Sequence, residues 1–458
     1  MSALSPEALE RLVAALPEGV VATRAETLEK YRHDGANDPT AQLPLACVRA
    51  ESTDHVVTTM RWATEHRVAV VPRGAGTGLS GGASGQSGAI TLSTERMRAV
   101  EVDPASRTVV VQPGLLNAEV KAAVAEHGLW YPPDPSSVQI CSIGGNLATN
   151  AGGLCCVKYG VTADYVLGLE VVLADGTVLR LGGRHVKDVA GLSLMPLFVG
   201  SEGTLGIITS ATLRLVPAQR PAATLVATFP TVAAAADAVV RVGRDVQPSM
   251  LELLDQAAIN AVEDYAPMGL DRDAGALLLA QSDAPGAARA AEVELVERAF
   301  EAAGALEVFS TDDVDEGELF IQARRLALPA LEQRGRVLLE DVGAAVPLLP
   351  DLLARIEAVA ARHGVAIPVV AHAGDGNTHP IIVVDTDDPD GEAKAQAAFV
   401  DVMAAAVEIG GTITGEHGIG RLKRDALPTQ LGPEVMAASR RVKDALDPLG
   451  LLSPGVLL

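Results

Sequence analysis

Short apolar runs bounded by glycine and proline dominate the first 220 residues. Residues 68–71 form one such run, which ends at Pro72 and Arg73, and a second run, residues 89–93, follows a loop rich in glycine. Residues 100–102 and 109–111 flank a turn-like segment, DPASRT. Runs rich in valine and isoleucine between turn-forming residues predict β-strands. We therefore expect this half to be rich in strands.

Other stretches of the same half carry helical or hairpin patterns. Residues 5–31 and 53–66 alternate as surface helices do, and residues 117–128 read as a capped helix with Asn117 at its start and Gly128 past its end. Apolar arms around Asp175-Gly176 predict a β-hairpin. An alternating strand then leads to Leu215.

Beyond residue 221 the apolar segments become longer and alternate between strand and helix patterns. The expected elements are a strand at 225–229, a helix to about 243, a strand at 276–281, a helix at 287–303 and a strand at 306–309. Such alternation predicts an α+β domain on an antiparallel sheet. Two more helices are expected at 392–409 and 433–446.

Length and composition restrict the classes of function. With 458 residues, 48% of them hydrophobic, the chain has material for two domains. A net charge of -22 makes nucleic acids and anionic membranes poor partners. The first residues lack a signal peptide pattern, and no apolar run reaches the length of a membrane span, so we expect a cytoplasmic protein. Adjacent Cys155 and Cys156 are either redox-active or two buried thiols.

The loop after Arg73 is the richest candidate site in the first half. Its glycines stand at 74, 76, 78, 81, 82, 85 and 88. Such a loop offers an array of backbone N–H donors to a phosphate. Three of these glycines also satisfy G-x-G-x-x-G, but a nicotinamide site needs a helix directly afterwards and the chain continues with a strand pattern. A flexible linker is the remaining alternative, and linkers do not lie between apolar β runs.

Longer motifs give the chain a family resemblance. The loop opened by Pro72-Arg73-Gly74 resembles the diphosphate loop of the flavoenzyme superfamily typified by vanillyl-alcohol oxidase. Residues 132–153 match its pattern P-x-D-P-S-S…I-G-G-N…T-N-A-G-G, and residues 197–206 read L-F-V-G-S-E-G-T-L-G. The chain is most similar to the D-2-hydroxyacid dehydrogenase branch, which contains the flavin-binding chain of glycolate oxidase, D-lactate dehydrogenase and D-2-hydroxyglutarate dehydrogenase. Residues 129–153 then read as a rigid irregular loop beside the flavin ring rather than an ordinary long loop.

The resemblance implies an α+β fold with three parts. These are a two-subdomain FAD-binding PCMH-type domain at 1–217, a ferredoxin-like α+β cap domain carrying a metal site at 218–410, and a C-terminal helical segment at 411–458 that packs back on the FAD domain. The residues that it implies for FAD binding are Pro72, Arg73, Gly74, Ala75, Gly76, Thr77, Gly78, Gly81, Gly82, Pro132, Asp134, Ser137, Gly144, Gly145, Asn146, Thr149, Ala151, Gly152, Gly153, Glu202, Gly203, Gly206 and Ile207.

A second candidate site lies in H-A-G-D-G-N-T-H, residues 372–379. If Asp375-Gly376 is a two-residue hairpin turn, His372 and His379 stand directly opposite each other on one face, which suits two imidazoles sharing one metal ion. The segment G-E-H-G-I-G at 415–420 offers a third ligand. In the family these motifs supply the metal ligands, here His372, His379 and Glu416, with zinc or manganese as the ion.

Two further residues match catalytic roles of the family. His417 matches its proposed general base, and imidazole titrates near neutrality, as removal of the hydroxyl proton from a 2-hydroxyacid requires. A nearby metal ion would assist by lowering the pKa of that hydroxyl. The substrate carboxylate needs a fixed cation, and the family places an arginine at Arg324 or Arg325. Spacing to Asp341 favours Arg324.

Departures from the family pattern narrow the expected substrate and the expected mode of FAD binding. Ile381 and Leu328 stand where D-2-hydroxyglutarate dehydrogenases carry polar residues for a second carboxylate, so a small or apolar 2-hydroxyacid is favoured over a dicarboxylate. Thr77 stands where relatives with covalently bound flavin carry histidine, so FAD is expected to be noncovalent. Cys141 lies near a second covalent position of distant oxidases.

The resemblance therefore implies FAD-dependent oxidation of a small D-2-hydroxyacid such as glycolate or D-lactate. Electrons would pass to a quinone, a cytochrome or an electron-transfer flavoprotein. Alternatives are D-2-hydroxyglutarate dehydrogenase, the flavin subunit of a multi-subunit glycolate oxidase, and a metal hydrolase beside a vestigial flavin fold. The chain is expected to act as a homodimer or as a subunit of an oxidase complex.

Overall fold

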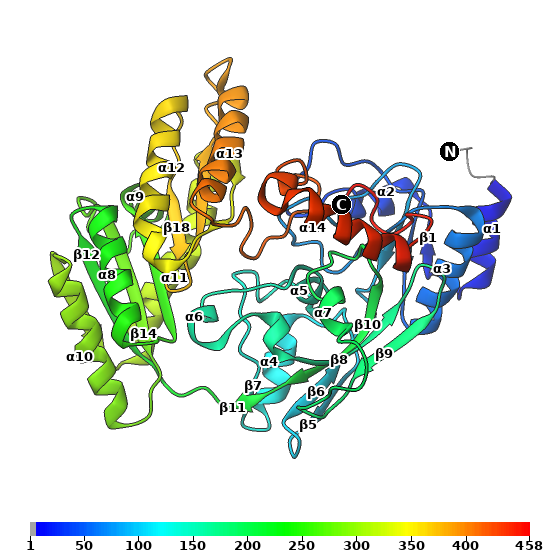
Figure 1. Cartoon of the computed structure of the whole chain (residues 1–458), viewed down its shortest axis with the longest axis horizontal. Helices are drawn as coiled ribbons and strands as arrows, with labels where there is room; N and C mark the ends of the chain where they lie inside the picture. Colours follow the sequence, from blue (N-terminus) through cyan, green and yellow to red (C-terminus); the bar gives the residue numbers. More distant parts are fainter. Residues whose placement is uncertain (1–5) are drawn as a thin grey trace. The chain divides into compact units, whose positions relative to one another are not determined.

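The chain folds into two compact units. The computed structural model describes residues 6–458, coloured along the chain in Figure 1. Unit 1 comprises Met1–Ala151, Val161–Ala218 and Glu416–Leu458, and unit 2 comprises Gly152–Gly160 and Gln219–Gly415. The three functional parts expected at 1–217, 218–410 and 411–458 stay a prediction, because division by contacts and division by function need not coincide. Within residues 6–458, no helix combines the length and apolar character that crossing a bilayer demands.

Unit 1 begins with a small sheet that carries the glycine loop. Strands β3 (Val70–Arg73) and β4 (Ile90–Ser93) are parallel neighbours with Val70 opposite Ile90. Strands β2 (Ala46–Arg49) and β4 are also parallel, whereas β1 (Val21–Ala22) is antiparallel to β2. The loop between β3 and β4 contains no helix, which confirms the strand-loop-strand prediction. The order of strands across the sheet is β1 (Val21–Ala22), β2 (Ala46–Arg49), β4 (Ile90–Ser93) and β3 (Val70–Arg73).

Helices α1 (Pro6–Ala15) and α3 (Thr53–His66) contribute to the core of this sheet. Leu12 and Met60 are fully buried together with Ile90. Helix α3 has the predicted bounds, and its N-cap Ser52 accepts a hydrogen bond from the N–H of His55. The prediction of helix throughout 5–31 was wrong, because the chain leaves the helix at Pro17 and Gly19, where φ is 80°, and forms β1.

A five-stranded antiparallel sheet forms the second part of unit 1. The hairpin of β8 (Val166–Val172) and β9 (Val178–Gly182) turns at Gly176, where φ is 81°, which confirms the hairpin predicted around Asp175-Gly176. The strand predicted to end near Leu215 is β10 (Ile207–Arg214). Across the sheet the order is β5 (Val100–Asp103), β6 (Thr108–Val111), β10 (Ile207–Arg214), β8 (Val166–Val172) and β9 (Val178–Gly182).

The segment predicted as an irregular loop at 129–153 contains a helix, α5 (Ile143–Thr149). Ser142 caps it by accepting a hydrogen bond from the N–H of Gly145. Gly144 lies in this helix. Its packing on Pro113 requires glycine, because a Cβ at position 144 would lie 2.6 Å from Cβ of Pro113. The pattern suggested a loop because two adjacent glycines lower helix propensity, but close packing requires at least one of them here. The short elements nearby are β7 (Leu129–Trp130), η2 (Thr162–Tyr165), α7 (Met195–Phe198) and β11 (Val216–Pro217).

Helix α4 (Asn117–Ala125) is present as predicted, but Asn117 does not cap it. The N-cap is Leu116, whose N–H donates to the carboxylate of Glu119. The buried Asn117 side chain donates instead to the carbonyl of Pro133 and to Oδ1 of Asn146. The amide thus fixes the segment that leads to α5.

Unit 2 is built on an antiparallel sheet of eight strands, in agreement with the α+β prediction. Strand β13 (Met250–Asp255) and helix α9 (Gln256–Tyr265), between the predicted elements, were not anticipated. In order the path is β15 (Glu307–Thr311), β12 (Ala223–Phe229), β14 (Ala276–Ser282), β13, β18 (Val369–His372), β19 (Asn377–Val383) and β16 (Val337–Leu339), and β17 (Val342–Gly343) also pairs with β19.

Helices cover both faces of this sheet. Phe229 of β12 meets Phe300 of α10 (Ala287–Ala302) on the face shared with α8 (Val232–Asp245). Val226 and Leu254 point to the other face and share a core with α9 and α11 (Val314–Glu332). The strands are therefore apolar on both faces, which explains their nearly unbroken hydrophobic runs.

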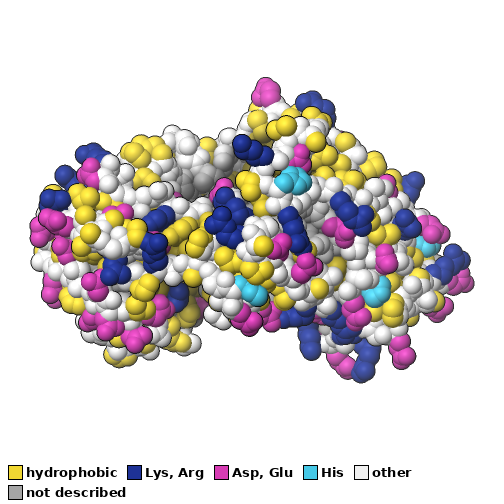
Figure 2. All heavy atoms as spheres, turned by 90° about the horizontal axis from the view of Figure 1, so that it is seen from below, with side chains coloured by type: hydrophobic (Ala, Val, Ile, Leu, Met, Phe, Trp, Pro, Cys, Tyr) yellow, Lys and Arg dark blue, Asp and Glu magenta, His cyan; other side chains and the backbone are white. Residues whose placement is uncertain are grey.

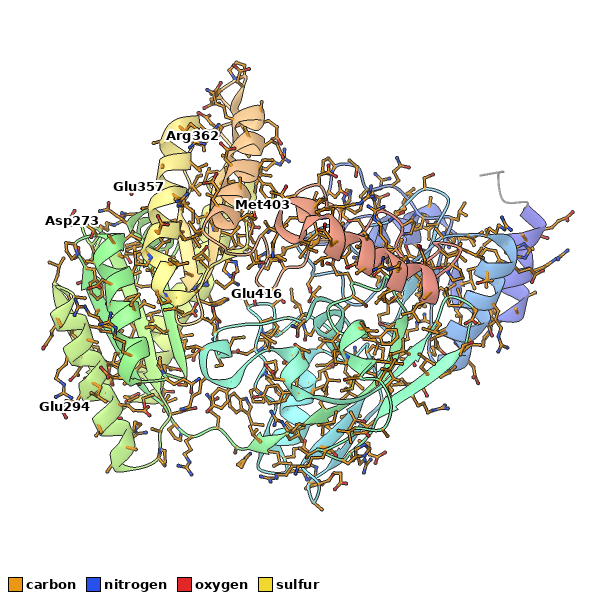
Figure 3. The ribbon with its side chains drawn as sticks, in the orientation of Figure 1. Asp273, Glu294, Glu357, Arg362, Met403 and Glu416 are labelled. Atoms are coloured by element: carbon orange, nitrogen blue, oxygen red, sulfur yellow. The ribbon has the colours of Figure 1, made fainter. Side chains whose placement is uncertain are left out.

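Helices α12 (Leu349–His363) and α13 (Gly391–Glu408) run side by side in unit 2, as Figure 1 shows. Arg362 of α12, labelled in Figure 3, forms an ion pair with Asp401 of α13, and Met403 is buried. Helix α13 belongs to unit 2.

Helix α14 (Leu427–Leu446) belongs to unit 1. It is interrupted at Gly432, where φ is 76°. Its Val442 and Leu446 pack against the core of the five-stranded sheet, and Leu452 forms a bridge with Val70 of β3. On the face that Figure 2 presents, acidic and basic side chains are interspersed with apolar ones.

Candidate functional site

The glycine loop of unit 1 brings bare backbone against the start of α5. A Cβ on Gly74 would lie 2.3 Å from Oγ of Ser142 and 3.3 Å from the backbone nitrogen of Gly145. The N–H of Ala75 donates to the same hydroxyl at 3.1 Å. Only glycine fits at position 74. The contacts with Ser142 and Gly145 show that two segments predicted to bind FAD, 72–82 and 132–153, meet here. Ser142, which joins them, was missed, although a serine before a helix is a recognisable capping signal.

Buried charges hold the loop in place. Arg73 donates from Nη1 to the carbonyl of Ala83 at 3.0 Å. The carboxylate of Asp34 accepts from the N–H of Ala83 and from the hydroxyl of Ser84, both at 3.1 Å. Burial raises the pKa of Asp34 above its ordinary value. Asp34 was also missed, because a lone acid in a polar segment carries no signal of burial.

The motif around Glu202 packs on the same loop. Gly203 has φ 72°, and a Cβ there would lie 3.0 Å from Cγ of Pro72. Glu202 has φ 52° and turns its buried carboxylate to the C-terminal segment, where it accepts hydrogen bonds from the N–H groups of Ile419 (2.8 Å) and Gly420 (2.7 Å). Burial raises the pKa of Glu202 to about 7. Glu202 therefore acts on another loop within unit 1.

The C-terminal segment that Glu202 contacts also carries His417. The hydroxyl of Ser80 donates to the carbonyls of His417 (3.0 Å) and Gly418 (2.8 Å). Gly420 has φ 53°, and a Cβ there would lie 1.9 Å from the carbonyl oxygen of Ser80. The side chain of His417 is 12% exposed and its Nε2 lies 4.0 Å from Oε1 of Glu416. The backbone beside His417 is thus anchored to the glycine loop, 337 residues earlier in the chain.

Other residues expected to bind FAD have structural contacts of their own. Oδ1 of Asn146 accepts from Asn117, and the hydroxyl of Thr149 donates to the carbonyl of Gly145. Gly206 packs on Val171, since a Cβ would lie 2.5 Å from its Cγ1. Gly152 and Gly153 fall in unit 2, in the segment 152–160. FAD binding stays a prediction for all the residues named for it, including Gly78, Gly81, Gly82, Pro132, Asp134, Ser137, Ala151 and Ile207, for which no contact is described above.

In unit 2, His372 and His379 lie on neighbouring strands with their rings close together. The ring centroids are 5.0 Å apart with an interplanar angle of 87°, and the two residues offer ligand atoms within 4.8 Å of each other. The predicted register was wrong, because His372 pairs with Asn377 and His379 pairs with Val370. The turn takes four residues rather than two, since the N–H groups of Asp375 and Gly376 both donate to the carbonyl of His372. The imidazoles are diagonal neighbours on one face.

Each imidazole has a buried carboxylate partner that the sequence did not reveal. Nδ1 of His372 lies 2.8 Å from Oε1 and 2.9 Å from Oε2 of Glu252 in β13. Nδ1 of His379 lies 3.7 Å from Oδ1 of Asp341, whose Oδ2 accepts from the hydroxyl of Thr414 (2.6 Å) and the N–H of Gly415 (2.9 Å). A carboxylate behind a histidine is the usual second partner of a metal-binding imidazole. Glu416 is the next residue after Gly415, so the chain itself supplies a carboxylate adjacent to this anchored segment.

Arg324 and Arg325 differ sharply in their surroundings. Nε of Arg324 lies 2.8 Å from Oε2 of Glu252 in an ion pair, and its side chain is 7% exposed. Its buried Nη2 has no hydrogen-bond partner in the described part of the chain. Arg325 is 44% exposed and pairs with Glu318 at the surface. Of the two candidates, only Arg324 offers a buried guanidinium edge with donor capacity left over.

The residues that depart from the family are apolar or buried. Ile381 is fully buried, and Leu328 packs against the core shared by α9 and α11. Cys141 is 2% exposed with Sγ 3.6 Å from Oδ1 of Asn146, and burial raises the pKa of its thiol. A covalent link through Cys141 is disfavoured because the thiolate is the reactive form. Cys155 is buried and Cys156 is partly buried.

The glycine loop of unit 1 and the histidine pair of unit 2 fit the two groups that the sequence implies, FAD and a divalent metal ion. The backbone around Gly74 and Gly76 leaves no room for side chains, as a cradle for a diphosphate requires. In unit 2, an imidazole whose Nδ1 is held by a carboxylate can present Nε2 to a metal ion.

Two family models match the chain. The model described as FAD binding domain matches residues 44–182. The model described as FAD linked oxidases, C-terminal domain, matches residues 218–457. The two matches together cover segments of both units.

Similar proteins of known name extend over nearly the whole chain. It is 40% identical over 428 residues to glycolate oxidase subunit GlcD of Bacillus subtilis (strain 168), with 93% of this chain and 91% of that protein covered. It is 34% identical over 423 residues to a D-lactate dehydrogenase of Archaeoglobus fulgidus, with 91% and 92% covered.

A solved structure shows the same fold. That of 4-ethylphenol oxidase from Gulosibacter chungangensis aligns with a TM-score of 0.81 at 19% identity, covering 99% of this chain and 98% of that one. The α+β fold of the FAD-binding PCMH type, predicted from the motifs, is thereby confirmed. The chain belongs to the family of FAD-linked oxidases and is an oxidoreductase that binds FAD.

Proposed function

We propose that this chain oxidises a small D-2-hydroxyacid, of the glycolate or D-lactate type, to the 2-oxoacid and passes the electrons to an acceptor other than oxygen. The names of the relatives support this substrate class. The observation that carries the proposal is the buried Nη2 of Arg324, which has no hydrogen-bond partner in residues 6–458, next to an ion-paired Glu252 that also contacts His372. A buried cation with an open donor edge is a binding point for a carboxylate.

The chain's own residues divide the work of the reaction. Arg324 holds the substrate carboxylate, and His417 takes the proton of the hydroxyl group as the C2–H bond breaks. Bound FAD would accept the hydride, and a zinc or manganese ion held by His372, His379 and Glu416 would supply a Lewis acid. The backbone around His417 is tied to Ser80, which keeps the base in a fixed place.

Two apolar positions support a small substrate. Ile381 is fully buried and Leu328 packs into the core, so neither provides a donor for a second carboxylate. Glycolate and D-lactate are therefore favoured over D-2-hydroxyglutarate. Noncovalent FAD is proposed because Thr77 offers no nucleophile comparable to histidine and Cys141 is buried.

Anaerobic mixing with a panel of D- and L-2-hydroxyacids tests the proposal. Glycolate and D-lactate should bleach the flavin absorbance, and His417→Ala should abolish bleaching while FAD stays bound. His127→Ala, which removes an exposed imidazole of the same unit, is the control. A strong chelator should slow reduction without loss of yellow colour. Full reduction in His417→Ala would remove this residue from the mechanism, and a panel without any bleaching would refute the substrate class.

We also propose that the chain acts as the flavin subunit of a larger oxidase complex. The name of the 40% identical relative contains the word subunit, which supports this second proposal. Purification of the tagged chain from its own cells should recover a second polypeptide in a fixed ratio. A tagged chain that passes electrons to a quinone, cytochrome or electron-transfer flavoprotein at full rate alone, as a monomer or homodimer, would contradict it.

A further inference from the structure

Glu252 is a charged residue in the middle of an apolar strand. It lies on β13 between Leu251 and Leu253, and its side chain is fully buried. A buried carboxylate is strongly unfavourable unless charge and hydrogen-bond partners compensate it. The partners of Glu252 are His372 and Arg324, both of which belong to the site proposed above.

The carboxylate determines which nitrogen of His372 carries the proton. Both of its oxygens lie within 2.9 Å of Nδ1. An ionised carboxylate only accepts hydrogen bonds, so His372 must hold its proton on Nδ1. A neutral imidazole of this tautomer carries its lone pair on Nε2, which is the form of imidazole that binds a metal ion.

The same carboxylate fixes Arg324. Nε of Arg324 lies 2.8 Å from Oε2, on the oxygen that is also 2.9 Å from His372. This contact leaves the buried Nη2 of Arg324 as an open donor. His379 has a looser arrangement, with its Nδ1 3.7 Å from Asp341.

We propose that Glu252 is a positioning residue that joins the metal-binding and carboxylate-binding halves of the site. It holds His372 in the tautomer that presents Nε2, and it orients the guanidinium of Arg324 toward the substrate carboxylate. This inference rests on the proposed function and adds to it a residue that touches neither substrate nor metal.

The test uses the full-length flavoprotein and the variant Glu252→Gln, which keeps the shape and removes the charge. An amide places an NH2 group where one oxygen faced Nδ1 of His372, and it leaves Arg324 as an uncompensated cation near the imidazoles. Affinity for Zn²⁺ and Mn²⁺, titrated against graded chelators without substrate, should fall tenfold to a hundredfold. The KM for glycolate or D-lactate should rise as well, while the flavin content stays that of the wild type.

Asp255→Asn is the matched control on the same strand. The carboxylate of Asp255 accepts hydrogen bonds from the N–H groups of Ala258 and Val369 and contacts neither His372 nor Arg324 in the described contacts. The control should lose stability and keep both metal affinity and KM. Equal metal affinity and equal KM in Glu252→Gln and wild type would overturn the proposal and reduce Glu252 to a structural role.

A second variant and the behaviour of the wild type separate the role of Glu252 from the proposed function. If Glu252→Gln does not fold, Glu252→Asp takes its place, because a side chain shorter by one methylene cannot reach both partners and should show the same losses in smaller measure. If wild type binds neither ion and no 2-hydroxyacid reduces its flavin, the proposed function fails. If wild type does both and the Glu252 variants do so equally well, only the role of Glu252 fails.

Discussion

Glu202 makes a quantitative prediction about stability and pH. Its carboxylate is buried in unit 1 and accepts hydrogen bonds from Ile419 and Gly420. Burial raises its pKa from 4.5 to about 7, and the two hydrogen bonds oppose the shift without cancelling it. The group is thus protonated in the folded protein and mostly ionised in the unfolded chain between these two values.

The sign and size of the effect follow from proton linkage. The folded state binds more protons than the unfolded chain between pH 4.5 and 7, so stability falls as pH rises through that window. At about 1.36 kcal/mol per pKa unit, the contribution of Glu202 to the free energy of unfolding should decrease by roughly 2 to 3 kcal/mol between about pH 5 and pH 8.

The variant Glu202→Gln isolates the pH-dependent contribution of Glu202 to the free energy of unfolding. The glutamine oxygen can accept from one of the two N–H groups, and losing the other hydrogen bond should cost about 1–3 kcal/mol at pH 5. The variant buries no charge at pH 8, so its deficit relative to wild type should shrink by roughly 2 to 3 kcal/mol there. Rising flavin fluorescence on release of FAD reports the unfolding of unit 1 in urea at each pH. Glu26→Gln is the control, because the side chain of Glu26 is 84% exposed. Its difference in stability from wild type should be the same at pH 5 and at pH 8. A deficit for Glu202→Gln that is the same at both pH values would refute the reasoning.

Two other substitutions test the remaining parts of the site. Gly74→Ala should lower the ratio of flavin to protein absorbance at least severalfold, since its Cβ would lie 2.3 Å from Oγ of Ser142, whereas Gly243→Ala, with no atom within 4 Å, should retain full flavin. Arg324→Lys should raise the KM for the hydroxyacid about tenfold to a hundredfold, the loss of one charge-assisted hydrogen bond, whereas Arg325→Lys at the surface should leave it unchanged. Full flavin content in Gly74→Ala, or equal KM in both arginine variants, would contradict these assignments.

The sequence predicted those parts of the fold whose signals are local. The strands on either side of the glycine loop, helix α3 and the hairpin at Gly176 were all found, because each has its apolar period and its turn or cap within a few residues. The sequence did not predict α5, since Gly144-Gly145 argues against a helix until Pro113, about thirty residues earlier, is seen to demand glycine there. Tertiary contact overrode propensity at that point.

The residues missed at the site share one property. Glu252, Asp341 and Ser142 act through another side chain or a backbone group rather than through a motif of their own. Glu252 had a faint signal, an acid inside the apolar run MLELLD, which is hard to reconcile with burial unless a partner compensates the charge. Which partner it meets depends on strand order, and β13 lies next to β18 although 114 residues separate Asp255 from Val369.

The register of β18 and β19 shows why the wrong prediction of the turn still placed the two imidazoles close together. The predicted two-residue turn put His372 opposite His379, whereas the four-residue turn puts His372 opposite Asn377. The two registers differ by an even number of positions, and side chains alternate between faces with a period of two, so both imidazoles stay on the same face. A shift by a single position would have sent His379 to the opposite face, away from Glu252 and Arg324. The exchange of an opposite pair for a diagonal one keeps the ring centroids 5.0 Å apart, close enough for one ion. The proposed metal site therefore depends on the parity of the hairpin register. A register shift by one position, forced by an insertion of one residue between Gly374 and Asn377, should abolish the proposed metal binding, whereas a shift by two would keep both imidazoles on one face.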